Sequence, residues 1–139
     1  MATFYGNFER SLDTKGRLIL PAKLRAEFGE SAFLTSHIDG CLALYDKEDM
    51  EVQRLAMLER TKGSQEDRMI ARVWASSTSE VTFDSQGRFP IPQPSREWAA
   101  LQVEVLVIGA IDKVELWQPQ KYREKASSAN LQLLEGTNL

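Results

Sequence analysis

Basic side chains that could contact phosphates and base edges gather in one short segment near the N-terminus of this 139-residue chain. Residues 10–25 contain five lysines or arginines and one aspartate, so the segment has a net charge of +4. The five are Arg10, Lys15, Arg17, Lys23 and Arg25. Lysine neutralises phosphates, and arginine can donate two parallel hydrogen bonds to a guanine edge. The chemistry that this segment predicts is therefore DNA binding.

The segment belongs to an internal repeat. Asp13-Thr-Lys-Gly-Arg17-Leu-Ile-Leu-Pro21 is followed, seventy-one positions later, by Asp84-Ser-Gln-Gly-Arg88-Phe-Pro-Ile-Pro92. A residue kept in both copies is expected to serve the shared fold. The kept pairs are Glu9/Glu80, Asp13/Asp84, Gly16/Gly87, Arg17/Arg88, Pro21/Pro92 and Arg25/Arg96. We interpret the aspartate, glycine and proline pairs as a motif scaffold.

The two copies differ in charge. Arg10, Lys15 and Lys23 face valine, glutamine and proline in the second copy, where residues 81–96 have a net charge of only +1. The first copy is therefore the predicted DNA-binding one, and Arg88 is a weaker candidate contact. A second interpretation stays open for Arg17 and Arg88, because an ion pair with the aspartate four residues earlier could merely stiffen the turn. Lys15 has no such alternative.

Hydrophobic periodicity predicts the elements around each motif. Residues 8–12 and 80–83 alternate, and short apolar strands follow at 18–20 and 89–91. Between them Asp-x-x-Gly-Arg predicts a hairpin turn, with the aspartate accepting backbone N–H bonds and the glycine in the left-handed conformation. Pro21 predicts the first position of a short helix that carries Leu24 and Phe28 and stops at Gly29.

The remaining apolar stretches predict two strand pairs and three longer helices. Residues 32–35 should pair with 41–45, and 103–108 with 114–117. Between the repeats, Asp46 and Asp49 predict the cap of one helix, and Ser64 with Asp67 a capping box for the next, with a break at 62–64. A last helix is expected from Pro119 through Leu131–Leu134 to Gly136. The apolar faces of these helices should pack against the body or a neighbouring subunit.

Composition limits the other function classes. The net charge is −3, and the longest apolar run, residues 105–111, is too short to cross a bilayer, so a cytoplasmic protein is expected. Cys41 and His37 are the only cysteine and histidine, so no Cys/His zinc site is predicted, and Cys41 is interpreted as a small buried hydrophobe rather than a reactive thiol. The chain lacks nucleotide-binding fingerprints and a nucleophile–base pattern, so we predict no enzyme, no cofactor, no metal and no small-molecule substrate.

Taken together, residues 4–21, the paired Asp-x-x-x-Arg motifs and the helical insert between them resemble the MraZ family of bacterial regulators of the division and cell-wall gene cluster. The likeness covers residues 4 to about 125. It implies an α+β fold of two pseudo-symmetric SpoVT-AbrB-like halves that form a swapped-hairpin β-barrel. The corresponding organisation is repeat 1 at 5–47, a helical linker at 48–75, repeat 2 at 76–119, and a C-terminal helix and tail at 120–139.

The resemblance also implies a function. It implies a homo-oligomeric ring that binds short direct repeats of double-stranded DNA in the promoter of its own operon, in the cytoplasm and associated with the nucleoid. The family's motif arginines map onto Arg17 and Arg88. The chain departs from the family pattern at Gln86, at Pro90, which removes a strand donor, and at Pro94, which should disturb the start of the next helix. The tail beyond Ala126 is also short for the family. The second half is therefore expected to build the assembly rather than contact DNA.

One alternative function remains. Swapped-hairpin folds also serve as antitoxin-like protein-binding modules, and the acidic total charge suits a basic partner. Antitoxins usually carry a disordered tail that folds on the toxin, and only the last dozen residues could do so here. Co-purification from lysate would separate the two functions, because promoter DNA favours the regulator and a stoichiometric small protein favours the module.

Overall fold

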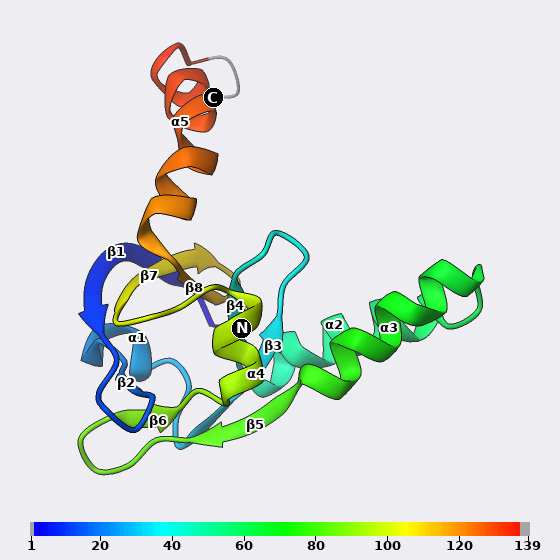
Figure 1. Cartoon of the computed structure of the whole chain (residues 1–139), viewed down its shortest axis with the longest axis horizontal. Coiled ribbons are helices and arrows are strands. Elements are labelled where there is room, and N and C mark those ends of the chain that lie inside the picture. The colour runs from blue at the N-terminus through cyan, green and yellow to red at the C-terminus, as the bar shows by residue number, and fades with distance from the viewer. Residues whose placement is uncertain (1, 137–139) are drawn as a thin grey trace.

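The computed structural model describes residues 2–136 and has an α+β fold with antiparallel sheets (Figure 1). The elements, in chain order, are β1 (Phe4–Ser11), β2 (Arg17–Ile19), α1 (Ala22–Arg25), β3 (Ser31–Ser36), β4 (Leu42–Tyr45), α2 (Lys47–Arg60), α3 (Gln65–Ser77), β5 (Ser79–Thr82), β6 (Arg88–Pro90), α4 (Gln93–Trp98), β7 (Glu104–Ile111), β8 (Val114–Trp117) and α5 (Pro119–Leu134). The helices between the two halves and the C-terminal helix are present as the sequence predicts.

Two sheets interleave the halves of the chain. The larger has the order β1-β7-β8-β4-β3-β5, and the smaller is the two-stranded ribbon β2-β6. The predicted pairs β3–β4 and β7–β8 are confirmed. The strands on either side of each motif, however, pair with the other half: β1 with β7, β5 with β3, and β2 with β6. The expectation that each motif turn joins two mutually paired strands is therefore wrong, although the turn itself forms.

The core lies between the ribbon and the larger sheet. Leu18 and Leu20 are almost fully buried while Ile19 between them is 47% exposed, as the period of a strand with one buried face requires. In the second copy, Phe89 and Ile91 are buried in the same way. These four residues share one cluster with buried side chains of β1, β3, β4, β7 and β8. Neither half has a core of its own, because each contributes residues to this one.

Pro90 and Pro94, the two prolines expected to disturb the second half, are both tolerated at the positions that they occupy. Leu20 N–H donates to Gly87 O, and Ile91 N–H donates to Gly16 O. In an antiparallel ladder this alternation places Pro90 opposite Arg17 at a position whose backbone groups point away from the partner strand. Pro90 therefore removes no donor from the ribbon. The prediction that Pro90 costs the strand a hydrogen-bond donor is wrong.

Pro94 also causes no disruption. It lies in the first turn of α4, where backbone N–H groups have no partner within the helix. Helix α4 has six residues, whereas the corresponding α1 has four. Pro92 and Pro21 precede these two helices as their N-caps.

The helical insert begins and ends at the predicted signals. Asp46 accepts a hydrogen bond from Asp49 N–H at the start of α2, and Ser64 with Asp67 forms the predicted capping box of α3. The two helices form a hairpin that extends from one side of the body (Figure 1). Five of its large apolar residues are about half exposed; they are Val52, Leu55, Leu58, Met69 and Val73. Packing against the body therefore does not explain why this face of the hairpin is apolar.

An apolar groove separates the insert from α4. We call it the insert groove. It has a volume of about 390 Å³, and its apolar lining is Ile38, Met57, Met69, Ile70, Val73, Trp74 and Trp98.

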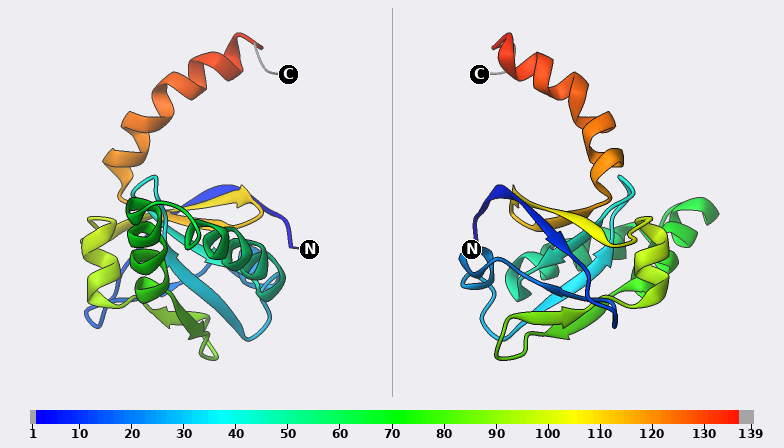
Figure 2. Two further views of the ribbon diagram at one scale, coloured as in Figure 1. Left: turned by 90° about the vertical axis from the view of Figure 1, so that its right-hand side faces the viewer. Right: turned by 60° about the vertical axis from the view of Figure 1, so that its left-hand side comes forward.

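Helix α5 rises from the body and touches it mainly at its first turns (Figures 1 and 2). Gln118 caps its start by accepting from Lys121 N–H, Lys121 Nζ donates to Gly40 O at 2.7 Å, and Tyr122 packs edge-to-face on Trp117. The far end carries exposed leucines at 131, 133 and 134. Residues 137–139 of the expected tail lie outside the described residues. Within residues 2–136, no helix combines the length and the apolar character needed to cross a membrane.

Candidate nucleic-acid interface

The first motif turn is a compact tip whose backbone is fixed by Asp13. Asp13 Oδ1 accepts hydrogen bonds from the N–H groups of Lys15 and Arg17, both at 2.9 Å. Asp13 N–H donates to Arg17 O, and Gly16 takes a φ of +74°. That left-handed conformation is costly for residues with a Cβ, which explains glycine here. Lys15 lies at the exposed apex of the turn. We call residues 13–17 the first tip.

The second carboxylate oxygen of Asp13 orients Arg17. Arg17 Nε donates to Asp13 Oδ2 at 2.7 Å, and both side chains are about one-third exposed. The Arg17 N–H bond, followed by the side-chain bond, lowers the pKa of Asp13, so the carboxylate is ionised at neutral pH. The ion pair that the alternative interpretation of Arg17 requires is present. It engages Nε, and among residues 2–136 neither terminal nitrogen of Arg17 has a hydrogen-bond partner.

The second motif turn, residues 84–88, repeats this geometry and is called the second tip. Asp84 Oδ1 accepts from the N–H groups of Gln86 and Arg88, and Arg88 Nε donates to Asp84 Oδ2 at 2.6 Å. These bonds, with the Arg88 backbone N–H first, lower the pKa of Asp84 to about 2. Gly87 has a φ of +82°. The apex differs in chemistry, because it is Gln86 where the first tip has Lys15.

The register of the ribbon places the two tips at its opposite ends. Gly16 is bonded to Ile91 at one end and Gly87 to Leu20 at the other. Along β2, Gly16 and Leu20 are four residue steps apart, or roughly 13 Å at about 3.3 Å per residue. The spacing is comparable with the width of a DNA major groove, about 12 Å. Both motifs therefore border one edge of the molecule (Figure 1).

Each tip is backed by an arginine from the other half. A Cβ placed on Gly16 would overlap Arg96 Nη1, and one placed on Gly87 would lie 2.5 Å from Arg25 Nη1. Arg96 Nη1 also donates to Ile91 O. The repeat analysis identified Arg25/Arg96 as a kept pair, but the contact across the halves has no signal in the sequence. Arg96 is thus the residue of this edge that sequence reasoning underestimated.

The other predicted contacts lie around the first tip rather than on it. Arg10 on β1 donates to Glu9 O and lies 5.8 Å from the centre of the Phe8 ring. Lys23 is exposed on α1, while Arg25 of the same helix is half-buried against Gly87. The structure brings Lys15 and Arg17 together on one tip and leaves Arg10, Lys23 and Arg25 on separate elements.

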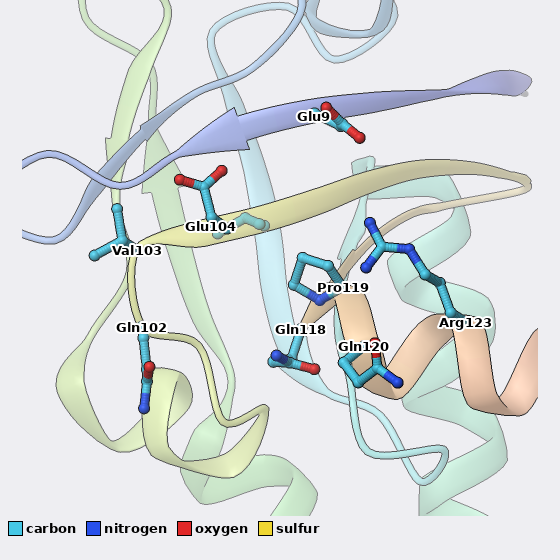
Figure 3. A pocket seen from close by; sticks show the side chains of 9 residues that line it. Glu9, Gln102, Val103, Glu104, Gln118, Pro119, Gln120 and Arg123 are labelled. Atoms are coloured by element: carbon cyan, nitrogen blue, oxygen red, sulfur yellow. The ribbon is translucent and has the colours of Figure 1, made fainter.

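A separate surface pocket of about 450 Å³ lies between β1, β7 and the start of α5 (Figure 3). Figure 3 shows Arg123 reaching from α5 toward the strands that carry Glu9 and Glu104. The pocket is lined by acidic as well as basic side chains, whereas a phosphate-binding surface is basic. We do not include this pocket in the candidate interface.

Comparison with known proteins adds to this geometry. The family model described as "MraZ protein, putative antitoxin-like" matches residues 3–73 and 75–136. The chain belongs to the MraZ family. Curated relatives named "Transcriptional regulator MraZ" include proteins from Natranaerobius thermophilus (37% identity, covering 91% of this chain and 90% of the relative) and Mycoplasmopsis pulmonis (41%, 85% and 80%). A third, from Heliobacterium modesticaldum, is 39% identical, with 89% of each chain covered. Membership of the MraZ family, a family of transcriptional regulators, confirms the predicted resemblance and agrees with a non-enzymatic role.

Proposed function

We propose that the chain is a sequence-specific DNA-binding transcriptional regulator that binds short direct repeats in the promoter of its own operon, within the division and cell-wall gene cluster. The observation that carries this proposal is the first tip, which presents Lys15 at its apex beside an Arg17 whose terminal nitrogens are unengaged among the described residues. The curated relatives bear the name of a transcriptional regulator. Such a protein acts in the cytoplasm, at the nucleoid.

In this proposal the structural and DNA-binding interpretations of Arg17 are parts of one mechanism. Asp13 holds Nε and so fixes the plane of the guanidinium before DNA arrives, which reduces the entropy lost on binding. The terminal nitrogens then donate to a guanine edge. Lys15 neutralises a phosphate, and Arg10 and Lys23 flank the contact. Arg25 contributes charge but acts chiefly by positioning the second tip through Gly87.

We further propose that the two halves form a swapped-hairpin β-barrel, divided as 5–47, 48–75, 76–119 and 120–139. The pairing of β1 with β7, β5 with β3 and β2 with β6 supports it, because every strand next to a motif is completed by the other half. The second tip lacks a lysine at its apex. It is therefore assigned to the assembly, with Arg88 as a weaker DNA contact.

The proposed working form is a homo-oligomeric ring. The insert groove and the half-exposed apolar face of α2 and α3 support it, because a second copy would remove this surface from water. One tip offers few phosphate contacts, so a useful affinity requires several subunits on one DNA. Operator repeats should then lie about 10 bp apart, so that neighbouring tips face one side of the duplex.

The test compares matched tip variants in fluorescence anisotropy with promoter DNA and with a scrambled duplex. Lys15→Gln makes the first apex resemble the second, and Arg88→Gln is the control for Arg17→Gln. We expect Arg17→Gln to cost roughly 1–3 kcal/mol of discrimination between the two duplexes, because a base contact is lost. Lys15→Gln should weaken binding to both duplexes and reduce the salt slope of that binding by about 1. Arg88→Gln should have a smaller effect than Arg17→Gln.

A gain-of-charge variant provides the reverse test. Gln86→Lys gives the second apex the charge of the first and should raise affinity for both duplexes while steepening the salt slope by about 1. Size-exclusion chromatography with light scattering checks that every variant keeps its subunit number. Unchanged promoter binding by Lys15→Gln and Arg17→Gln, in an intact assembly, would refute the proposed interface.

A further inference from the structure

Three side chains with metal-binding atoms meet on the side of the larger sheet next to α4 and α5. A ring nitrogen of His37, the Cys41 sulfur and a Glu115 carboxylate oxygen all lie within 4.8 Å of one another. Cys41 is fully buried, and the other two are partly exposed. The cluster is separate from both tips and has no part in the proposed DNA contact.

Strand pairing and a tight turn bring the three together. His37 N–H donates to Cys41 O at 2.9 Å, and Gly40 N–H donates to His37 O at 2.9 Å, so the turn between β3 and β4 folds His37 back over Cys41. Glu115 comes from β8, which pairs with β4 and has Ala43 opposite Glu115. The turn and the pairing of β4 with β8 therefore bring the three residues together.

The donor set matches zinc chemistry. Imidazole nitrogen, thiolate sulfur and carboxylate oxygen are the three ligand types that Zn²⁺ takes in proteins, and three protein ligands leave a fourth position for water. We propose that His37, Cys41 and Glu115 form a binding site for a zinc-class divalent cation. On binding, the Cys41 thiol loses its proton to solvent and a sulfur–metal bond forms, so one proton is released for each ion bound.

Two carboxylates near the Cys41 sulfur, Glu115 and Asp39, favour a cation at the cluster. Burial, followed by the charges of Glu115 and Asp39, raises the pKa of the Cys41 thiol, so without a cation the sulfur stays protonated. A divalent ion would stabilise the thiolate and offset the repulsion between these groups. Lys113 is the opposing charge near Cys41, and it also forms an ion pair with Asp112. The partly exposed His37 ring provides the side from which an ion enters.

A second layer of polar groups orients the ligands. Trp117 Nε1 donates to Glu115 Oε1 at 3.0 Å, which leaves Oε2 available for the cation, and Trp98 Nε1 donates to His37 O at 3.2 Å. Asp39 N–H donates to His37 Nδ1 at 3.1 Å. Cation binding through Nε2 puts the ring proton on Nδ1, so His37 then exchanges the bond from Asp39 N–H for one that Nδ1–H donates to Asp39 Oδ2, 3.5 Å away.

Sequence spacing did not predict this site because its third ligand is distant along the chain. One histidine and one cysteine fall short of a zinc motif, and Glu115 lies seventy-four positions after Cys41. Only the pairing of β4 with β8 brings the carboxylate to the turn.

The experiment uses the full-length chain, stripped with EDTA and dialysed against Zn²⁺. We expect about one zinc per chain by elemental analysis. With Co²⁺ as the probe, we expect a sulfur-to-cobalt charge-transfer band in the near ultraviolet. Cys41→Ala should abolish the band, and Cys41→Ala and Glu115→Gln should each weaken binding roughly tenfold or more, the least expected when a ligand is removed. Tryptophan fluorescence should respond to Zn²⁺ in the unmutated chain.

Matched controls separate loss of the site from loss of the fold. Glu115→Gln keeps the acceptor for Trp117 Nε1, so the strand is undisturbed while the charged ligand is lost. Glu104→Gln removes an exposed carboxylate from the adjacent β7 and should leave zinc binding unchanged. Zinc content that is the same in Cys41→Ala and Glu115→Gln as in the unmutated chain, or a cobalt complex without the sulfur band, would overturn the proposal. Neither readout depends on DNA binding, so the proposed function is tested separately.

Discussion

Arg96 of the second half lies across Gly16 of the first tip, close enough that the guanidinium occupies the space of a Cβ at that position. Arg96 Nη1 also donates to Ile91 O, the residue whose N–H donates to Gly16 O. The glycine of the first tip therefore has two constraints: a left-handed φ and the approach of an arginine from the other half. Arg25 and Gly87 repeat the relationship at the second tip.

Gly16→Ala should destabilise the protein more than Gly29→Ala. Gly29 has nearly the same φ, +75°, but a Cβ there would contact nothing within 4 Å. Both variants incur the left-handed cost of about 1–2 kcal/mol. Gly16→Ala should cost roughly 1 kcal/mol more, because Arg96 must leave its bond to Ile91 O. Urea unfolding of the two variants measures the difference, and equal losses would show that Arg96 does not constrain the tip.

Lys23 and Arg25 lie on the same short helix and should respond differently to alanine. Lys23 is exposed and its side chain makes no hydrogen bond or ion pair among residues 2–136, so Lys23→Ala should change stability by less than about 0.5 kcal/mol while reducing the salt slope of DNA binding by about 1. Arg25 packs against Gly87, so Arg25→Ala should lower the unfolding free energy by roughly 1 kcal/mol or more. Denaturant melts and anisotropy at several salt concentrations provide both readouts. A salt slope that Lys23→Ala leaves unchanged would remove Lys23 from the interface.

The tips should retain their aspartate-based structure well into acid. The folded pKa of Asp84 is about 2, below the ordinary value of 3.8, so its stabilisation is fully present above about pH 4 and is lost as the pH falls through about 2. Asp84→Asn removes the charge at every pH. The stability difference between the unmutated chain and Asp84→Asn should therefore shrink as the pH falls from 4 to 2. Carboxyl-carbon NMR titration measures the pKa directly, and a midpoint near 3.8 would contradict the bonding described for the second tip.

The features that sequence predicts well are those whose causes are local. The alternation of Leu18, Ile19 and Leu20, the turn chemistry of Asp13 and Gly16, and the caps at Asp46 and Ser64 all depend on neighbours within four residues. The partners of the strands were not predictable in this way. An alternating pattern specifies which face of β1 is buried, but nothing in it selects β7, a hundred residues away, over the adjacent β2.

The same limit applies to the candidate site. The placement of Lys15 and Arg17 on one tip could be predicted because one local motif contains both. The contact of Arg96 with Gly16 depends on the exchange of strands between halves, and so does the harmless position of Pro90, which becomes clear only once its partner is Arg17. Contacts between the two halves therefore cannot be predicted from local sequence patterns alone.

The exposed face of α3 gives a test of the ring. Val73 is 45% exposed and lines the insert groove, so Val73→Asp leaves the body intact but places a charge where a second copy is proposed to bind. Burying an unpaired carboxylate in an interface costs several kcal/mol, enough to reduce the assembly to smaller species at micromolar concentration. Val73→Leu keeps the apolar contact and should assemble normally. Mass photometry of both variants distinguishes the outcomes. A full-sized Val73→Asp assembly would place the subunit contact elsewhere, whereas smaller species that also lose promoter binding would show that affinity depends on several tips acting on one DNA.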